Sequence, residues 1–103
     1  MGPKWSDVGG NMGLFSTHWA GEYQGHKIEV VRKVGGHEFD LLIDGEMADR
    51  QTSLANMGKR ELEGSLHVAG RDLTVHAVGI QNAFSEAAEV TVDGQPVTMT
   101  KIK

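Results

Sequence analysis

The residues that could do chemistry in this chain are histidines and carboxylates, because it has no cysteine. Without a thiolate there is no cysteine nucleophile, no cysteine-based zinc site and no disulfide. Of the five histidines, His67 and His76 form the most promising pair, since a hairpin would place both on one polar face, diagonal to each other. A zinc site normally takes three or four ligands, and this pairing forces no carboxylate beside them. We therefore expect two solvent-facing histidines and no metal or other cofactor.

Acid–base catalysis would need paired carboxylates in a cleft that shifts their pKa values. The candidates are the carboxylates Asp40, Asp49, Glu61 and Glu63. They stand at strand positions that alternate outward, which favours a solvated face over an active site. Asp44 and Asp93 each precede a glycine, and turn geometry explains both. No Gly-x-Ser-x-Gly sequence exposes a nucleophile, so we expect a protein that is not an enzyme.

Charge and composition limit the classes of partner that the protein can bind. The formal net charge is -4 and the sequence pI is about 5.6, so electrostatics does not draw the chain to nucleic acid or to an anionic membrane surface. The longest apolar stretches are only a few residues, too short to cross a bilayer. Met1 is followed by Gly-Pro-Lys, which does not begin a secretory signal. We expect a cytoplasmic protein whose partner is another protein or a second copy of itself.

The elements that must position these residues are hairpins, of which the clearest covers 38–50. An alternating run meets Asp44-Gly45 and continues in a more polar return strand. A two-residue loop predicts three cross-strand pairs: Leu41 with Ala48, Phe39 with Arg50, and Leu42 with Met47. A three-residue loop with a glycine bulge would instead place Met47 opposite Leu41.

Two further hairpins follow the same pattern. Asp93-Gly94 predicts a two-residue turn that pairs Val90 with Val97, Ala88 with Met99, and Glu86 with Lys101. The runs 60–68 and 73–78 flank residues 69–72, which predicts the hairpin that carries the two histidines. The two Asp-Gly turns lie on the order of fifty residues apart, a spacing that hints at an internal duplication.

The whole pattern predicts an all-β fold. Residues 1–13 lack periodicity and are expected to form a flexible tail, and 14–103 a single domain. Residues 14–20 are the first expected strand, in which Trp19 anchors the core, and 21–25 a connection. The next run alternates, so Ile28 and Val30 are expected to point inward. About eight strands at intervals of roughly ten residues are typical of an antiparallel β-sandwich or a partly open barrel.

In this order of strands the chain resembles a domain of the Fas apoptosis inhibitory molecule family. The resemblance covers about Trp19 to Lys101 and rests on the tryptophan, on His26-Lys27-Ile28-Glu29, on Gly58-Lys59-Arg60-Glu61, and on the hairpins at Ile43-Asp44-Gly45 and Val92-Asp93-Gly94. It implies a non-enzymatic antiparallel β-sandwich. Members of that family restrain death-receptor signalling and protect cells against protein aggregation.

Two functional hypotheses follow from these observations. The preferred one is a non-catalytic interaction module that uses a sheet face or an edge strand, with Thr98, Thr100 and Ile102 near one candidate edge. The alternative is a small-molecule or metal binding protein that uses the sheet interior, with His67, His76 and Trp19 near its mouth. The size of the domain favours the first, because a small domain fills its core with its own apolar residues.

Overall fold

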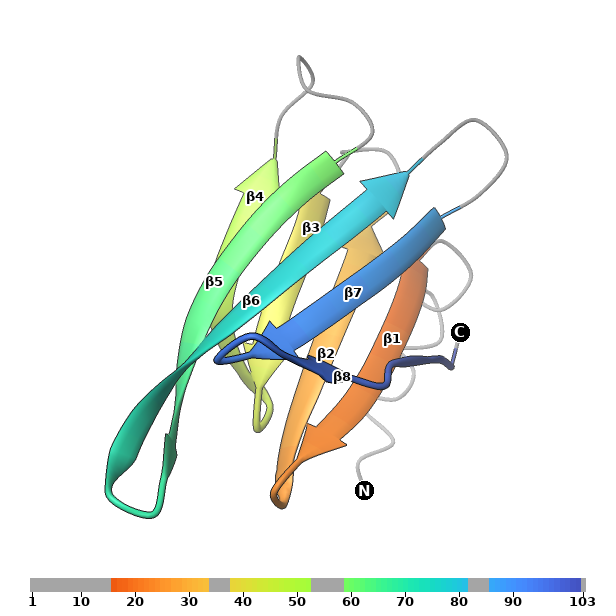
Figure 1. The fold of residues 1–103 in the computed structure, drawn as a ribbon. Coiled ribbons are helices and arrows are strands. Elements are labelled where there is room, and N and C mark those ends of the chain that lie inside the picture. Colours follow the sequence, from red (N-terminus) through yellow and green to blue (C-terminus); the bar gives the residue numbers. More distant parts are fainter. Residues whose placement is uncertain (1–15, 34–37, 53–58, 82–85, 103) are drawn as a thin grey trace, which may run out of the picture.

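The computed structural model describes residues 16–33, 38–52, 59–81 and 86–102, and these form two antiparallel β-sheets (Figure 1). The described residues contain nine strands: β1 (Ser16–Tyr23), β2 (His26–Lys33), β3 (Glu38–Ile43), β4 (Glu46–Thr52), β5 (Lys59–Val68), β6 (Arg71–Gln81), β7 (Glu86–Val92), β8 (Gln95–Val97) and β9 (Thr100–Lys101). The predicted all-β sandwich is confirmed, with nine strands where about eight were expected, and the sheets do not close into a barrel.

Strands that follow one another in the chain pair side by side in each sheet, except that β9 adds beside β1. The five-stranded sheet has the order β4-β3-β2-β1-β9, and the four-stranded sheet has the order β5-β6-β7-β8. The edge strands β4 and β5 lie beside each other along one side of the sandwich. On the opposite side the chain leaves β8 and crosses to the other sheet as β9 (Figure 1). The groove described below lies along the first of these two sides.

The space between the sheets is filled by apolar side chains of both. Ile28 and Val30 point inward as predicted and are fully buried, and Trp19 is only 4% exposed. The Trp19 and Phe39 rings stack at a centroid distance of 6.4 Å. Phe39 reaches across to β6, where a β-carbon added at Gly79 would lie 2.4 Å from its ring. Phe39, the largest of the fully buried side chains, therefore depends on a glycine in the facing sheet.

Four tight turns share one backbone geometry. In each, both central residues have positive φ, as in type I′ turns: Gln24-Gly25, Asp44-Gly45, Ala69-Gly70 and Asp93-Gly94. Type I′ turns match the right-handed twist of the strands that they join. Two connections are therefore shorter than predicted. The one expected over 21–25 is shortened because β1 continues to Tyr23, and the one expected over 69–72 has only two residues.

The β3–β4 hairpin confirms part of its predicted register. Leu42 lies opposite Met47, as a two-residue loop requires. Beyond this pair the register shifts, and Leu41 faces Asp49 instead of Ala48. The predicted pairing of Phe39 with Arg50 is wrong for the same reason. A β-bulge leaves Ala48 unpaired. The residue types of the Asp44-Gly45 turn do not predict this bulge.

The β7–β8 hairpin is also shorter than expected. Val90 pairs with Val97 as predicted, but the pairs Ala88 with Met99 and Glu86 with Lys101 are wrong, because β8 ends at Val97. The chain then passes over β1, where a β-carbon added at Gly21 would lie 2.5 Å from the Thr98 carbonyl oxygen. The missing side chain at Gly21 gives the crossing chain its room.

The two halves of the chain repeat one arrangement. Asp44 N donates to Lys27 O and Asp44 Oδ1 accepts from Lys27 N, at 2.8 and 3.0 Å. Asp93 makes the same two bonds with Thr74, both at 2.8 Å. The common docking of the two Asp-Gly turns strengthens the hint of an internal duplication. The halves differ in that the β5–β6 hairpin extends further beyond this bond and projects from the sandwich (Figure 1).

Some expectations fall on residues outside the described ranges. They are the flexible tail expected over 1–13 and the start of the first expected strand at 14 and 15. Within the described ranges, no helix is long and apolar enough to cross a membrane.

Candidate functional site

A groove of about 720 Å³ lies between the β3–β4 turn and β5. Residues from both sheets line it: His26, Ile43, Asp44, Glu46, Met47, Ala48, Glu63, Gly64, Ser65, Leu66, His67 and Thr74. The β3–β4 hairpin forms one wall, and the projecting β5–β6 hairpin forms the other. The groove therefore exists because the second hairpin is longer than its counterpart in the first half of the chain.

The base of the groove is the seam where the edges of the two sheets meet. A β-carbon added at Gly64 would lie 2.9 Å from Ala48 Cβ and 2.9 Å from Ile43 Cδ1. Glycine at this position lets β5 approach β4 without a clash. The bulge at Ala48 and the glycine at position 64 thus fit together.

Asp49 closes this seam with hydrogen bonds. Its Oδ2 accepts from the backbone N of Glu63 on β5 at 2.9 Å, and its Oδ1 accepts from Arg50 N at 2.8 Å. The amide that Asp49 caps lies on the outer edge of β5, where no neighbouring strand of the same sheet can pair with it. Asp49, considered above as an acid–base candidate, therefore has a structural role.

His26 and Asp44 face each other at one end of the groove, with His26 Nδ1 2.7 Å from Asp44 Oδ2. The hydrogen bond from His26, together with that from the Lys27 amide, holds the pKa of Asp44 below its ordinary value. This contact fixes the β3–β4 turn against the start of β2. No sequence pattern predicts this contact, because His26 follows the β1–β2 turn and Asp44 belongs to the β3–β4 turn.

The predicted diagonal pair of His67 and His76 is wrong. His67 lies opposite Asp72 and His76 lies opposite Glu63, so the two histidines are too far apart along the hairpin to be diagonal neighbours. The prediction assumed a four-residue loop over 69–72, and the two-residue turn shifts the register. Each ring meets a carboxylate instead, His67 Nδ1 at 2.9 Å from Asp72 Oδ1 and His76 Nε2 at 3.3 Å from Glu61 Oε1.

Metal ligation was weighed above for the histidines. Among the described residues, no group of three or more His, Asp or Glu side chains is arranged to hold a metal ion. Only His67 of the two candidate histidines lines the groove. Trp19, the other residue considered for a binding site, is a core residue.

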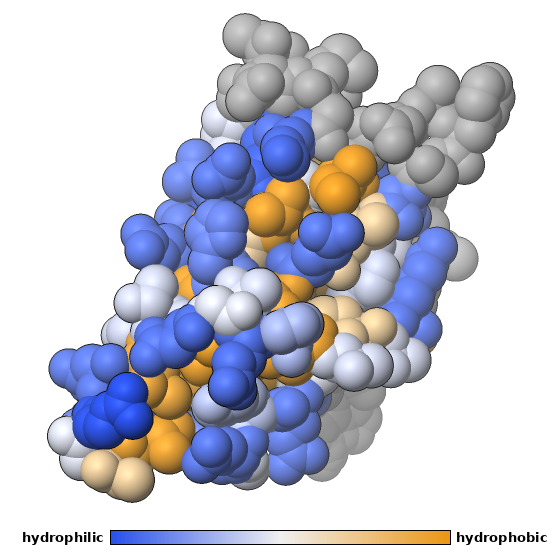
Figure 2. All heavy atoms as spheres, viewed as in Figure 1, coloured by the Kyte–Doolittle hydropathy of each residue, from blue (hydrophilic) through white to orange (hydrophobic). Residues whose placement is uncertain are grey.

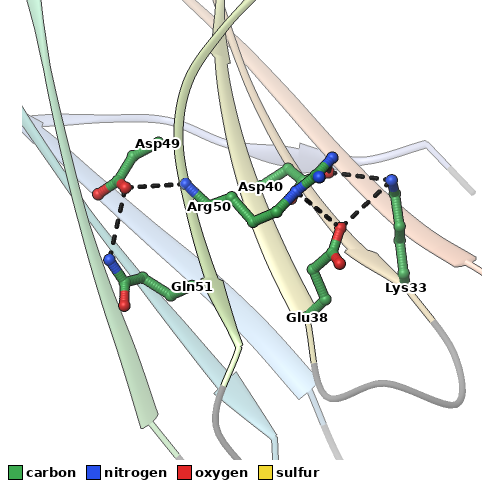
Figure 3. A network of polar contacts seen from close by, with 6 residues as sticks. All are labelled: Lys33, Glu38, Asp40, Asp49, Arg50 and Gln51. Atoms are coloured by element: carbon green, nitrogen blue, oxygen red, sulfur yellow. Dashed lines mark hydrogen bonds and ion pairs between the residues drawn. The ribbon is translucent and has the colours of Figure 1, made fainter.

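Alternation predicted that Asp40 lies on a solvated face, and this prediction is wrong. The residue is only 2% exposed. Arg50 Nε lies 2.9 Å from Asp40 Oδ1 and Lys33 Nζ lies 3.2 Å from Asp40 Oδ2 (Figure 3). Both cations also approach Glu38 Oε2, at 3.0 Å for Arg50 and 3.3 Å for Lys33. Burial acts to raise the pKa of Asp40, but the hydrogen bonds from its partners, led by that of Arg50, hold it below its ordinary value.

Glu86 is the centre of a second polar cluster, which joins the two sheets. At the start of β7, its carboxylate accepts hydrogen bonds from Thr17 Oγ1 on β1 and Arg32 Nε on β2. Lys101 Nζ on β9 lies 3.5 Å from Glu86 Oε2. Burial acts to raise the pKa of Glu86, and the Thr17 and Arg32 hydrogen bonds lower it below its ordinary value. Sequence reasoning paired Glu86 with Lys101 within one hairpin, whereas the contact runs between sheets.

The C-terminal edge is as expected. Thr100 belongs to β9, the edge of the five-stranded sheet, and Thr98 and Ile102 flank it. Ile102 N donates to His18 O at 2.7 Å, while its side chain is 51% exposed. The second exposed large apolar side chain is Met47, which lines the groove at the opposite edge. Figure 2 shows that the face formed by β5, β6 and β7 is mostly hydrophilic, with apolar atoms between the polar ones.

The described residues form a small all-β sandwich with an open groove at one pair of sheet edges. No protein-family model, no curated protein and no solved structure matches the chain.

Proposed function

We propose that this protein is a non-catalytic interaction module that binds an extended segment of a partner protein in the groove between the β3–β4 turn and β5. The observation that carries the proposal is a groove lined by an open strand edge. An extended peptide can add to such an edge through main-chain hydrogen bonds, while pockets beside it select side chains.

The backbone of β5 supports this mode of binding. Glu63 N points away from β6, toward Asp49. Because the direction of backbone groups repeats every second residue of a strand, Ser65 N and His67 N point to the same edge. Asp49 caps this edge at Glu63, and among the described residues no side chain caps it at Ser65 or His67, so these two amides can pair with a bound strand.

The other features of the molecule support binding rather than catalysis. Two of the carboxylates with lowered pKa values, Asp40 and Glu86, are held by cations in structural clusters outside the groove. The third, Asp44 at one end of the groove, is held by hydrogen bonds from His26 and the Lys27 amide, which fix its turn. The interior is occupied by the protein's own side chains, such as Phe39, which leaves the surface for ligands. The resemblance to Fas apoptosis inhibitory molecule domains favours the same class of function, and the cysteine-free chain suits the reducing cytoplasm.

Selection of binding peptides from a displayed random library tests the proposal. Ser65→Trp places an indole in the groove at an exposed position, and Glu89→Trp places one at an exposed position of β7 outside it. We expect the selected peptides to lose binding to Ser65→Trp and to keep it with Glu89→Trp. Equal binding to both variants would contradict the proposal that peptides bind in the groove, provided that circular dichroism shows both variants to be folded.

A further inference from the structure

The walls of the groove carry two carboxylates without an ion-pair partner. Glu46 begins β4 on one wall, and Glu63 lies on β5 on the other. Both residues are exposed, and within the described part of the chain neither carboxylate forms an ion pair or a side-chain hydrogen bond. Like charges that face a common groove repel each other, and a cation placed between them removes that repulsion.

Most carboxylates elsewhere in the described ranges are already matched. Asp40 contacts Arg50, Glu86 contacts Arg32, and Glu29 contacts Lys27. The residues that line the groove include no lysine or arginine, although the described residues contain both types elsewhere. The groove is therefore a place where negative charge is left unbalanced, next to the open edge of β5.

We infer that the segment bound in the groove is cationic, an extended stretch with lysine or arginine side chains that reach Glu46 and Glu63. This inference rests on the proposed function and adds the chemistry of the partner. The main chain of the segment pairs with the edge amides of β5, and its cations meet the two carboxylates. Exposed Met47 and the methylene stems of lysine or arginine supply the apolar contact between them.

The test uses two labelled peptides of about eight residues, comparable to a strand of the protein. One alternates lysine with threonine and valine, and the other has glutamine in place of each lysine. Fluorescence anisotropy at low salt measures their affinity for the full chain. We expect the lysine peptide to bind about tenfold more tightly, as two exposed ion pairs allow, and to lose that advantage at high salt.

Charge-neutral variants locate the effect. Glu46→Gln with Glu63→Gln removes both groove carboxylates, and we expect the two peptides then to bind alike. Glu89→Gln is the matched control, because Glu89 is also exposed and without an ion-pair partner among the described residues but lies outside the groove. It should keep the preference for lysine. Loss of the preference in the Glu89→Gln variant as well would overturn the inference.

The remaining outcomes separate this inference from the proposed function. If the lysine peptide binds no better than the glutamine peptide, while library-selected peptides are still blocked by Ser65→Trp, the inference fails and the groove stands. If Ser65→Trp also leaves the selected peptides unaffected, both fail. An acidic peptide that binds more tightly than the lysine peptide would likewise overturn the inference.

Discussion

Ala69 has φ of 52° at the first position of a type I′ turn, where an alanine side chain gains nothing to offset the strained backbone. Asp44 and Asp93 occupy the same position in their turns, and there the side chain accepts a backbone hydrogen bond. We predict that Ala69→Asn stabilises the fold by about 0.5–1 kcal/mol, because asparagine tolerates left-handed geometry better. Chemical denaturation measures the change. An unaltered midpoint would contradict the turn assignment.

The placement of some residues follows from their own type and strand, and the placement of others depends on neighbouring strands. Trp19 was correctly placed in the core because a large indole buries more area than any other side chain. Ile28 and Val30 were correctly placed there because alternation along one strand decides which way a side chain points. Asp40 was placed in solvent by the same rule and is buried, since the rule takes no account of the cations that an adjacent strand brings beside it. Alternation predicts to which face of the sheet a side chain points, while its burial depends on the side chains of adjacent strands.

At the scale of elements, hairpins were predictable and their ends were not. Asp-Gly sequences specify two-residue turns, which placed Leu42 opposite Met47 and Val90 opposite Val97 correctly. The bulge at Ala48 and the crossing after Val97 depend on contacts with strands distant in sequence. The groove arises from the bulge, together with the unexpected length of the β5–β6 hairpin. It could not have been derived from the sequence.

Asp49 tests how the edges of β4 and β5 are joined. We predict that Asp49→Ala destabilises the fold by about 1–2 kcal/mol, because it removes the acceptor for the Glu63 amide at the seam. Amide hydrogen exchange should accelerate at Glu63 more than at Val75 in the core. Glu61→Ala is a suitable control, since Glu61 is exposed on the same strand and contacts only His76. Equal effects of both substitutions would argue against the seam.

For the whole molecule, the two polar clusters predict how stability depends on pH. The folded-state pKa values of Asp40 and Glu86 lie below the ordinary values of 3.8 and 4.5. A carboxylate with a lowered folded-state pKa stabilises the fold above its unfolded pKa and loses that contribution as pH falls through the folded value. We therefore expect the melting temperature to fall as the pH drops below about 4.5.

Variants assign this acid sensitivity to the clusters. Asp40→Asn and Glu86→Gln should each flatten the decline in melting temperature at low pH. Each should also lower stability at neutral pH, because the neighbouring cations lose the carboxylate that they contact. Glu22→Gln is the control, because Glu22 is exposed and forms no ion pair among the described residues. A decline in Asp40→Asn and Glu86→Gln as steep as in the unmodified protein would contradict this assignment.

The central claim, that an extended segment binds along β5, is tested most directly by amide nuclear magnetic resonance of the ¹⁵N-labelled protein with a library-selected peptide. Binding in the groove predicts the largest shifts at Glu46 and Met47 on one wall and at Ser65 and His67 on the other. Exchange of the Ser65 and His67 amides should slow as they enter main-chain hydrogen bonds. Shifts confined to the opposite edge, around Thr100, would contradict the account.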